Sequence, residues 1–195
     1  MSEAVDFKIV EEPKRPLAMN PKKFGMWLFM ASVLMLFISL TSAYIVRQAE
    51  GNWLFFDLPT IFIVSTAIIV ASSVTMQLAF WAARKDDVER VKVMVLLTAI
   101  LGLAFVVSQY LGWKDLVARS VYLVGNPSGS FLYIITGLHA IHLISAVVFL
   151  LFVLYYRFRN KVNSKNTVQV EICTTYWHFL GLLWVYLYVF LTLLR

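Results

Sequence analysis

Residues 131–156 read FLYIITGLHAIHLISAVVFLLFVLYY, a stretch without any Asp, Glu, Lys or Arg. An α-helix rises about 1.5 Å per residue, so about 20 apolar residues cross the roughly 30 Å hydrocarbon core of a bilayer. The stretch is long enough and apolar enough to do so. We therefore predict that Phe131–Tyr156 forms a transmembrane helix.

Four further stretches are equally apolar and free of charged residues. They are Phe24–Val46, Leu58–Ala83, Val93–Trp113 and Ile172–Leu194. Only 14% of the residues are charged and 61% are hydrophobic, whereas about 25% of the residues of a soluble protein are charged. The sequence thus predicts an all-α bundle of five spans over residues 24–195, after a polar tail of residues 1–23. Pro59 is expected in the first turn of the second span, where its missing N–H costs nothing.

The distribution of Lys and Arg predicts the orientation of the spans. Thirteen of the 17 Lys and Arg residues fall in the tail and in the connections after spans two and four. They are Lys8, Lys14, Arg15, Lys22, Lys23, Arg84, Lys85, Arg90, Lys92, Arg157, Arg159, Lys161 and Lys165. The other side of the membrane has Arg47, Lys114, Arg119 and Arg195. Cytoplasmic segments are enriched in Lys and Arg, so we expect a cytoplasmic N-terminus and a C-terminus outside.

The same distribution argues against a role in binding nucleic acid. The net charge of +6 is spread over three short segments, and these form no basic surface that reads nucleic acid. Ion and proton transport across a membrane uses titratable groups in the spans. The five spans hold no carboxylate and, apart from histidine, no basic residue, so we do not expect this chain to pump protons by itself. The single cysteine, Cys173, excludes a cluster of thiolates from this chain alone.

Small residues recur every four positions in the second span, at Ala67, Ala71, Thr75 and Ala79. Small residues allow two helices to approach closely in lipid. We predict that this strip packs inside the bundle. Ala99 and Gly102 begin a similar strip in the third span.

The three histidines lie in the last two spans. His139 and His142 are three residues apart and share a helix face, and His178 lies early in the fifth span. At the helical rise, His142 and His178 fall at depths that differ by about 4 Å, so we predict that they are neighbours in the inner half of the membrane. Three interpretations remain open. The histidines ligate a b-type haem, form a metal site, or hydrogen-bond to hydroxyls, backbone carbonyls or lipid headgroups.

Four motifs resemble the subunit III family of the haem–copper oxidases. Residues 133–142 read YIITGLHAIH, similar to the family's Thr-Gly-x-His-x-x-His signature. Residues 176–184 read YWHFLGLLW, which resembles its Tyr-Trp-His-Phe motif with a Trp six residues after the His. Gly25–Ser32 with Ala43-Tyr44 resembles the family's Gly-x-x-Leu-Phe-x-x-Ser helix, and Gln109 falls where the family has a Gln. The resemblance covers about residues 21–195.

The resemblance implies a non-catalytic subunit of a cytochrome c oxidase in the respiratory chain of a bacterial cytoplasmic (inner) membrane. Such subunits bind beside the catalytic subunit I and other oxidase subunits, and subunit I holds the haem and copper. They carry no cofactor themselves, bind phospholipid, support proton uptake and prolong the life of the enzyme. On this reading His139, His142, Trp177 and His178 contact lipid or serve as structural polar groups. No catalytic, cofactor-binding or metal-binding residue is expected. The cytoplasmic residues Asp86, Asp87 and Glu89 are candidates for collecting protons.

The chain departs from the family pattern in three respects. It matches the last five helices of the seven-helix form. Val33 follows Ser32 where the family usually has an intramembrane Glu, and Gly112 and Gly181 stand where members often have Glu or Asp. Two alternatives therefore remain: an accessory subunit of a quinol oxidase or nitric oxide reductase, and a membrane anchor that holds a b-type haem through His142 and His178.

Overall fold

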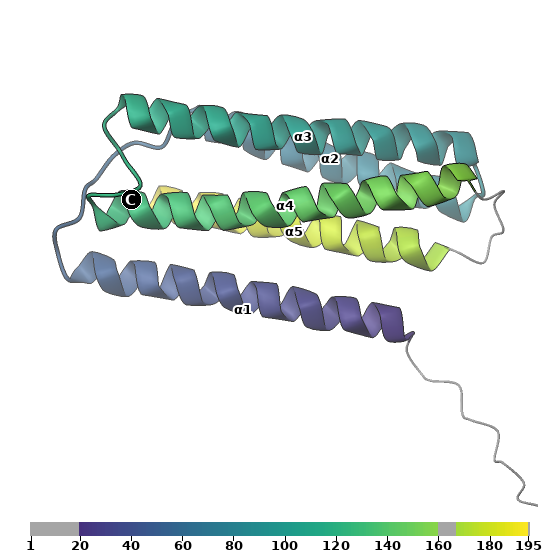
Figure 1. Ribbon diagram of the computed structural model, residues 1–195, viewed down its shortest axis with the longest axis horizontal. Helices are drawn as coiled ribbons and strands as arrows, with labels where there is room; N and C mark the ends of the chain where they lie inside the picture. The colour runs from purple at the N-terminus through teal and green to yellow at the C-terminus, as the bar shows by residue number, and fades with distance from the viewer. Residues whose placement is uncertain (1–19, 160–166, 195) are drawn as a thin grey trace, which may run out of the picture.

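The computed structural model describes residues 20–159 and 167–194, except for the side chains of residues 156–159 and 167. The described residues form five α-helices and no strand. The helices are α1 (Pro21–Ala49), α2 (Ile61–Arg84), α3 (Val88–Ala118), α4 (Pro127–Arg159) and α5 (Thr167–Leu193) (Figure 1). Each is long and apolar enough to cross a membrane. The predicted all-α fold with five spans is confirmed.

The helices run up and down, so their connections lie at two ends of the bundle (Figure 1). The α1–α2 and α3–α4 connections meet at one end, here called the Asn126 end. The starts of α1 and α5 and the α2–α3 turn lie at the other, here called the Lys23 end. Helix α1 contacts α4 and α5 alone among the described helices, whereas the most extensive contact is between α2 and α3. The bundle is therefore a group of four helices with α1 along one side.

Local signals set the helix starts. The side chain of Asn20 accepts a hydrogen bond from the Lys22 N–H at 3.0 Å and caps α1, and Pro21 occupies the first turn. An Asn cap satisfies an N–H that lacks a partner within the helix. The side chain of Asp87 does the same for α3 through the Arg90 N–H at 3.2 Å.

The helix bounds differ from the predicted spans, because a helix can continue beyond the hydrocarbon core of the membrane. Helix α3 runs five residues beyond the predicted span at each end and includes Lys92 and Lys114. Helix α2 begins at Ile61, so Leu58 and Pro59 lie in the preceding connection. The Pro59 carbonyl accepts a hydrogen bond from the Phe62 N–H at 3.0 Å and leads the chain into the helix.

The predicted packing strip of α2 is confirmed at its end, where Ala79 is buried and Thr75 half-buried, but it is wrong for its first two members. Ala67 and Ala71 are exposed, and the buried face instead carries Ser65 and Ser72. Each serine hydroxyl donates to the carbonyl of the residue three positions earlier, which lets it enter the core without an unpaired proton. The shorter strip is confirmed, because Ala99 and Gly102 are both buried in α3.

Part of the predicted orientation rests on residues outside the described part. These are Lys8, Lys14, Arg15, Lys161, Lys165 and Arg195, together with the side chains of Arg157 and Arg159.

Candidate functional site

His139 of α4 lies at the centre of the bundle. Its side chain is fully buried and its ring contacts Phe105 of α3 and Trp184 of α5 at centroid distances of 5.7 and 5.0 Å. The ring Nε2–H donates to the Leu180 carbonyl oxygen of α5 at 3.1 Å. The Leu180 carbonyl oxygen therefore accepts a hydrogen bond from another helix, α4, and not only from α5. His139 ties two helices together and has no access to lipid.

His142 lies one turn further along α4 and faces α1. Its ring is half-buried, contacts Phe37 of α1 at a centroid distance of 5.8 Å, and donates from Nδ1 to the Leu138 carbonyl at 2.7 Å. Among the four predicted site residues on α4 and α5, His142 and His178 are the ones with exposed surface.

Trp177 and His178 of α5 both bind side chains of α2. The indole N–H of the fully buried Trp177 donates to the Ser72 hydroxyl at 3.1 Å. The Nε2–H of the half-buried His178 donates to Gln77 Oε1 at 3.0 Å. These two residues therefore secure α5 against α2.

The two histidines of the predicted pair have different partners in the structure. His142 has partners on α1 and on its own helix, whereas His178 is bound to Gln77 of α2. A haem held by His142 and His178 would have to break the bond from His178 Nε2 to Gln77. As the side chains stand, the two histidines are therefore not a ready pair of haem ligands.

Three further polar contacts between helices follow one pattern, in which an indole or amide N–H donates to a hydroxyl on a neighbouring helix. Gln109 Nε2 donates to Ser65 Oγ at 3.0 Å. Trp184 Nε1 donates to Thr66 Oγ1 at 3.0 Å, and Trp113 Nε1 donates to Thr136 Oγ1 at 3.1 Å. The hydroxyls themselves donate to carbonyls one turn earlier. Buried polar groups without partners cost several kcal/mol in such surroundings, so these bonds fix which helices are neighbours.

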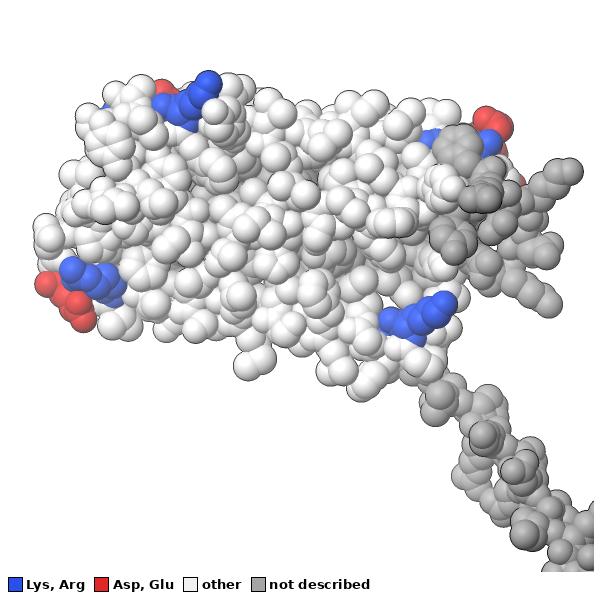
Figure 2. All heavy atoms as spheres, in the orientation of Figure 1, with Lys and Arg blue, Asp and Glu red and all other residues white. Residues whose placement is uncertain are grey.

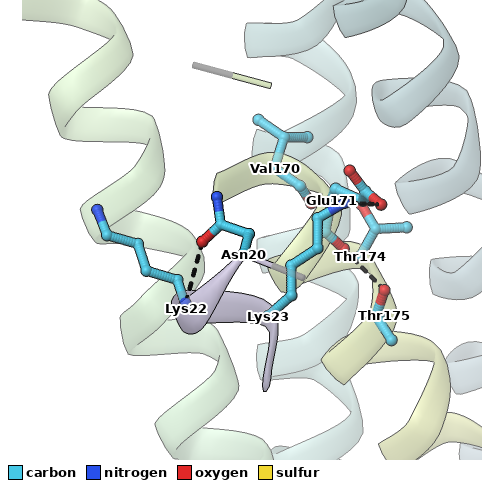
Figure 3. A network of polar contacts seen from close by, with 7 residues as sticks. All are labelled: Asn20, Lys22, Lys23, Val170, Glu171, Thr174 and Thr175. Atoms are coloured by element: carbon cyan, nitrogen blue, oxygen red, sulfur yellow. Dashed lines mark hydrogen bonds and ion pairs between the residues drawn. The ribbon is translucent and has the colours of Figure 1, made fainter. Parts of the chain in front are cut away.

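An ion pair that the sequence analysis missed joins α1 to α5 at the Lys23 end. Lys23 Nζ lies 2.6 Å from Glu171 Oε1, with both side chains about one-third exposed (Figure 3). Glu171 falls one residue before the predicted fifth span and Lys23 one residue before the first, so both were read as ends of connections. Both residues lie near the starts of helices that begin at the same end of the bundle. The shared depth of the two predicted span starts could have indicated that they meet.

Several grooves open on the sides of the described bundle, and three of them are large. The first, of about 590 Å³, lies between α1, α4 and α5 at the Lys23 end; Lys22 is at its mouth, and Met26, Phe29, Phe149 and Phe152 form walls. The second, of about 710 Å³, lies along α1 at the Asn126 end beside Phe131. The third, of about 520 Å³, lies between α3 and α4 beside Trp113 and Gly137. Lys22 points toward α4, away from the Lys23–Glu171 pair (Figure 3).

The residues that depart from the family pattern are packed as apolar core. Val33 is buried in α1. A Cβ on Gly112 would lie 2.7 Å from the Phe62 ring, so Phe62 of α2 fills the space that a longer side chain would need. A Cβ on Gly181 would lie 3.0 Å from Ser73 Oγ. Among the residues that the structure describes, no three His, Cys, Asp or Glu side chains come together as a metal site.

The sequence was compared with known proteins. Residues 14–194 match the family described as cytochrome c oxidase subunit III. A probable cytochrome c oxidase subunit 3 of Nocardia farcinica is 30% identical over 183 residues, covering 90% of this chain and 89% of the relative. Cytochrome c oxidase subunit 3 of Corynebacterium diphtheriae is 28% identical over 200 residues and 97% of both chains. A probable quinol oxidase subunit 3 of Staphylococcus saprophyticus is 26% identical over 175 residues and 87% of both chains.

The family match covers nearly the whole chain, and the relatives are of similar length. The motifs of the fourth and fifth spans are the residues that hold α4 and α5 to their neighbours. This chain is an integral membrane protein that belongs to the cytochrome c oxidase subunit III family, and so is a subunit III of a haem–copper terminal oxidase.

Proposed function

We propose that this chain binds directly beside the haem–copper subunit I of a cytochrome c oxidase and stabilises it without taking part in the chemistry. The observation that carries the proposal is the match to the subunit III family over residues 14–194. Membership of this family implies association with other oxidase subunits, and its members are non-catalytic. Haem and copper belong to the partner, where they supply electron transfer and oxygen reduction.

A scaffolding role agrees with how the chain uses its polar residues. His139, Trp177 and Trp184 each donate a hydrogen bond to a group on a neighbouring helix. A rigid bundle can present a fixed surface to subunit I, because the helices are tied by directional bonds as well as by packing.

Lipid binding is the second part of the proposal. We assign it mainly to the grooves rather than to all four of the residues that the sequence suggested. His139 and Trp177 are fully buried, so their role is structural. The groove of about 590 Å³ has apolar walls for an acyl chain and Lys22 at its mouth for a phosphate. His142 and His178 keep exposed surface and remain candidates for contact with lipid.

Orientation and proton uptake complete the proposal. Of the Lys and Arg residues whose side chains the structure describes, six lie at the Lys23 end and three at the Asn126 end, which supports a cytoplasmic Lys23 end in a bacterial inner membrane. The α2–α3 turn at that end carries Asp86 and Asp87, and the first turn of α3 carries Glu89; these acidic groups are our candidates for collecting protons near an uptake path. Asp87 and Glu89 also pair with Arg90 and Lys92.

Deletion of the chain from its organism tests the role. We expect the oxidase purified without this subunit to keep its haem spectrum and initial turnover, and to lose activity several-fold faster during continuous turnover. Restoring the chain should restore the lifetime of the enzyme. An oxidase with unchanged lifetime and unchanged subunit content would reject the proposal.

The similarity to a protein named as a probable quinol oxidase subunit 3 supports a second candidate, a partner that oxidises quinol. The two candidates differ in the electron donor and not in this chain's own chemistry. Oxygen consumption by the purified complex, measured with reduced cytochrome c and then with a quinol, separates them.

A further inference from the structure

Three buried side-chain polar atoms have no hydrogen-bond partner among the described residues, and two of them lie away from both ends of the bundle. These two are Oε1 of Gln109 in α3 and Nδ1 of His139 in α4. The third, Nε1 of Trp53, lies at the Asn126 end beside the Tyr44 ring. Gln109 is 1% exposed and His139 0%. Nearly all polar atoms so deeply buried in folded proteins have a partner, either in the protein or in an ordered water.

Both central atoms are hydrogen-bond acceptors. The Leu180 carbonyl oxygen, 3.1 Å from His139 Nε2, can only accept, so Nε2 carries the proton and Nδ1 of the neutral ring carries a lone pair. The Ser65 hydroxyl donates to the Phe62 carbonyl at 2.9 Å, so its oxygen accepts from Gln109 Nε2 at 3.0 Å. This leaves Gln109 Oε1 without a donor. The two atoms therefore both need a group that donates to them.

The two acceptors lie at nearly the same level on adjacent antiparallel helices. Trp113 of α3 donates to Thr136 of α4, and the Phe105 ring of α3 contacts the His139 ring. Gln109 lies midway between Phe105 and Trp113, so it faces the part of α4 that runs from Thr136 to His139. Along the bundle axis Gln109 is therefore within about one helical turn, or about 5.4 Å, of His139.

The donors that the chain offers at this level already have acceptors. The Thr136 and Ser108 hydroxyls each donate to a carbonyl of their own helix at 2.7 Å. Trp184, whose ring contacts His139, donates its N–H to Thr66. Figure 2 shows charged residues near the two ends of the bundle and an uncharged surface between them on the face in view. The donor therefore has to come from outside the chain.

The packing of α3 against α4 is looser next to these acceptors than elsewhere along α3. A Cβ on Gly137, two residues before His139, would meet only the Trp113 ring, at 4.0 Å. On Gly102 and Gly112 of α3 it would meet a ring at 2.6 and 2.7 Å. Gly137 also lines the α3–α4 groove of about 520 Å³. A buried water needs such room, together with two or more polar partners.

We infer that an internal water molecule is bound between α3 and α4, where it donates one proton to Gln109 Oε1 and the other to His139 Nδ1. Water is small enough for the core and has the two protons that two acceptors require. The bridge ties α3 to α4 deep in the membrane, in addition to the Trp113–Thr136 bond nearer the Asn126 end. The inference concerns the interior of this chain, so it does not depend on the partner that the proposed function assigns.

Electron cryo-microscopy of the purified native complex tests the inference, in a map that resolves ordered waters elsewhere in the complex. We expect one density peak within hydrogen-bonding distance of both Gln109 Oε1 and His139 Nδ1. No peak at these atoms, or separate peaks that do not bridge them, would overturn the inference. A lipid or a side chain of another subunit that donates there would do the same. The subunits in the sample are identified separately, so failure of the water site and failure of the proposed function are distinct results.

A double-mutant cycle gives a second test, with the thermal stability of the complex in detergent as the measurement. Gln109→Leu and His139→Phe each break the bridge, so the combined loss of stability should be smaller than the sum of the single losses. Gln109→Leu with His178→Phe is the control pair. His178 binds Gln77 of α2, which lies twelve residues, or about 18 Å, from Ser65, the partner of Gln109. The control losses should add, and additive losses in both pairs would contradict the bridge.

Discussion

Trp177 shows at the scale of a residue how this bundle is held together. Its fully buried ring fits against Gly102 of α3, while its N–H binds Ser72 of α2. One side chain from α5 thus meets two other helices, by shape on one side and by a hydrogen bond on the other. Gly102 is required because a Cβ there would lie 2.6 Å from the Trp177 ring.

Substitution Gly102→Ala should therefore destabilise the bundle. Overpacking a core typically costs about 1–3 kcal/mol, since the ring must shift. Gly25→Ala is the matched control, because a Cβ at Gly25 has nothing within 4 Å. The fraction of complex that stays soluble after a heating series in detergent measures both. Equal loss of stability in the two variants would contradict this account of Trp177.

The sequence singled out four residues of α4 and α5, but it did not predict which neighbour each one contacts. Spacing placed His139 and His142 on one face, and yet one is fully buried and the other half-buried. Three residues of helix leave about 60° between two side chains, which is enough to turn one toward the core and the other toward α1. Spacing within one helix contains no information about which neighbour occupies each direction.

At the scale of the helix, α1 differs from the others in its attachment. It touches only α4 and α5 among the described helices. Its polar contacts with α5 and the residue after it include the Lys23–Glu171 pair at one end. Toward the other end the Thr41 and Tyr186 hydroxyls lie 3.1 Å apart, and Tyr44 and Gln48 donate to the Leu194 carbonyl at 3.2 and 2.9 Å. Helix α1 is thus fastened to α5 near both of its ends.

A charge exchange tests the tie at the Lys23 end. Lys23→Glu and Glu171→Lys should each weaken the α1–α5 contact, because each places like charges together. The double variant should recover most of the loss. Partly exposed ion pairs are worth about 0.2–1 kcal/mol, so the effect is small. Resistance of α1 to proteolysis in detergent measures it, and a double variant no better than the single ones would show that the pair does not couple the helices.

The helices themselves were largely predictable, because charge-free apolar runs determine where a chain crosses a membrane. The packing face of α2 was not. The repeat of small residues favoured Ala67 and Ala71, but Ser65 and Ser72 lie inside because Gln109 and Trp177 need acceptors. This need for acceptors arises from side chains on α3 and α5, so it cannot be predicted from the sequence of α2 alone.

At the scale of the molecule, the orientation in the membrane follows from charge and has a direct test. Cys173 is the only cysteine and is buried, so we expect the native chain not to react with a thiol reagent such as a maleimide. We expect Glu50→Cys to react with an impermeant maleimide in intact cells. Lys85→Cys should react only after the membrane is opened. The reverse pattern would invert the proposed topology.

The central claim is that this chain works as subunit III beside a haem–copper catalytic subunit. The most direct measurement is purification of a tagged chain from native membranes in mild detergent, with the partners identified by mass spectrometry and the haems by a reduced-minus-oxidised spectrum. The account predicts a large haem–copper subunit in equal amount, with all haem belonging to it. Recovery of the chain without such a subunit, or with its own b-type haem, would contradict the account.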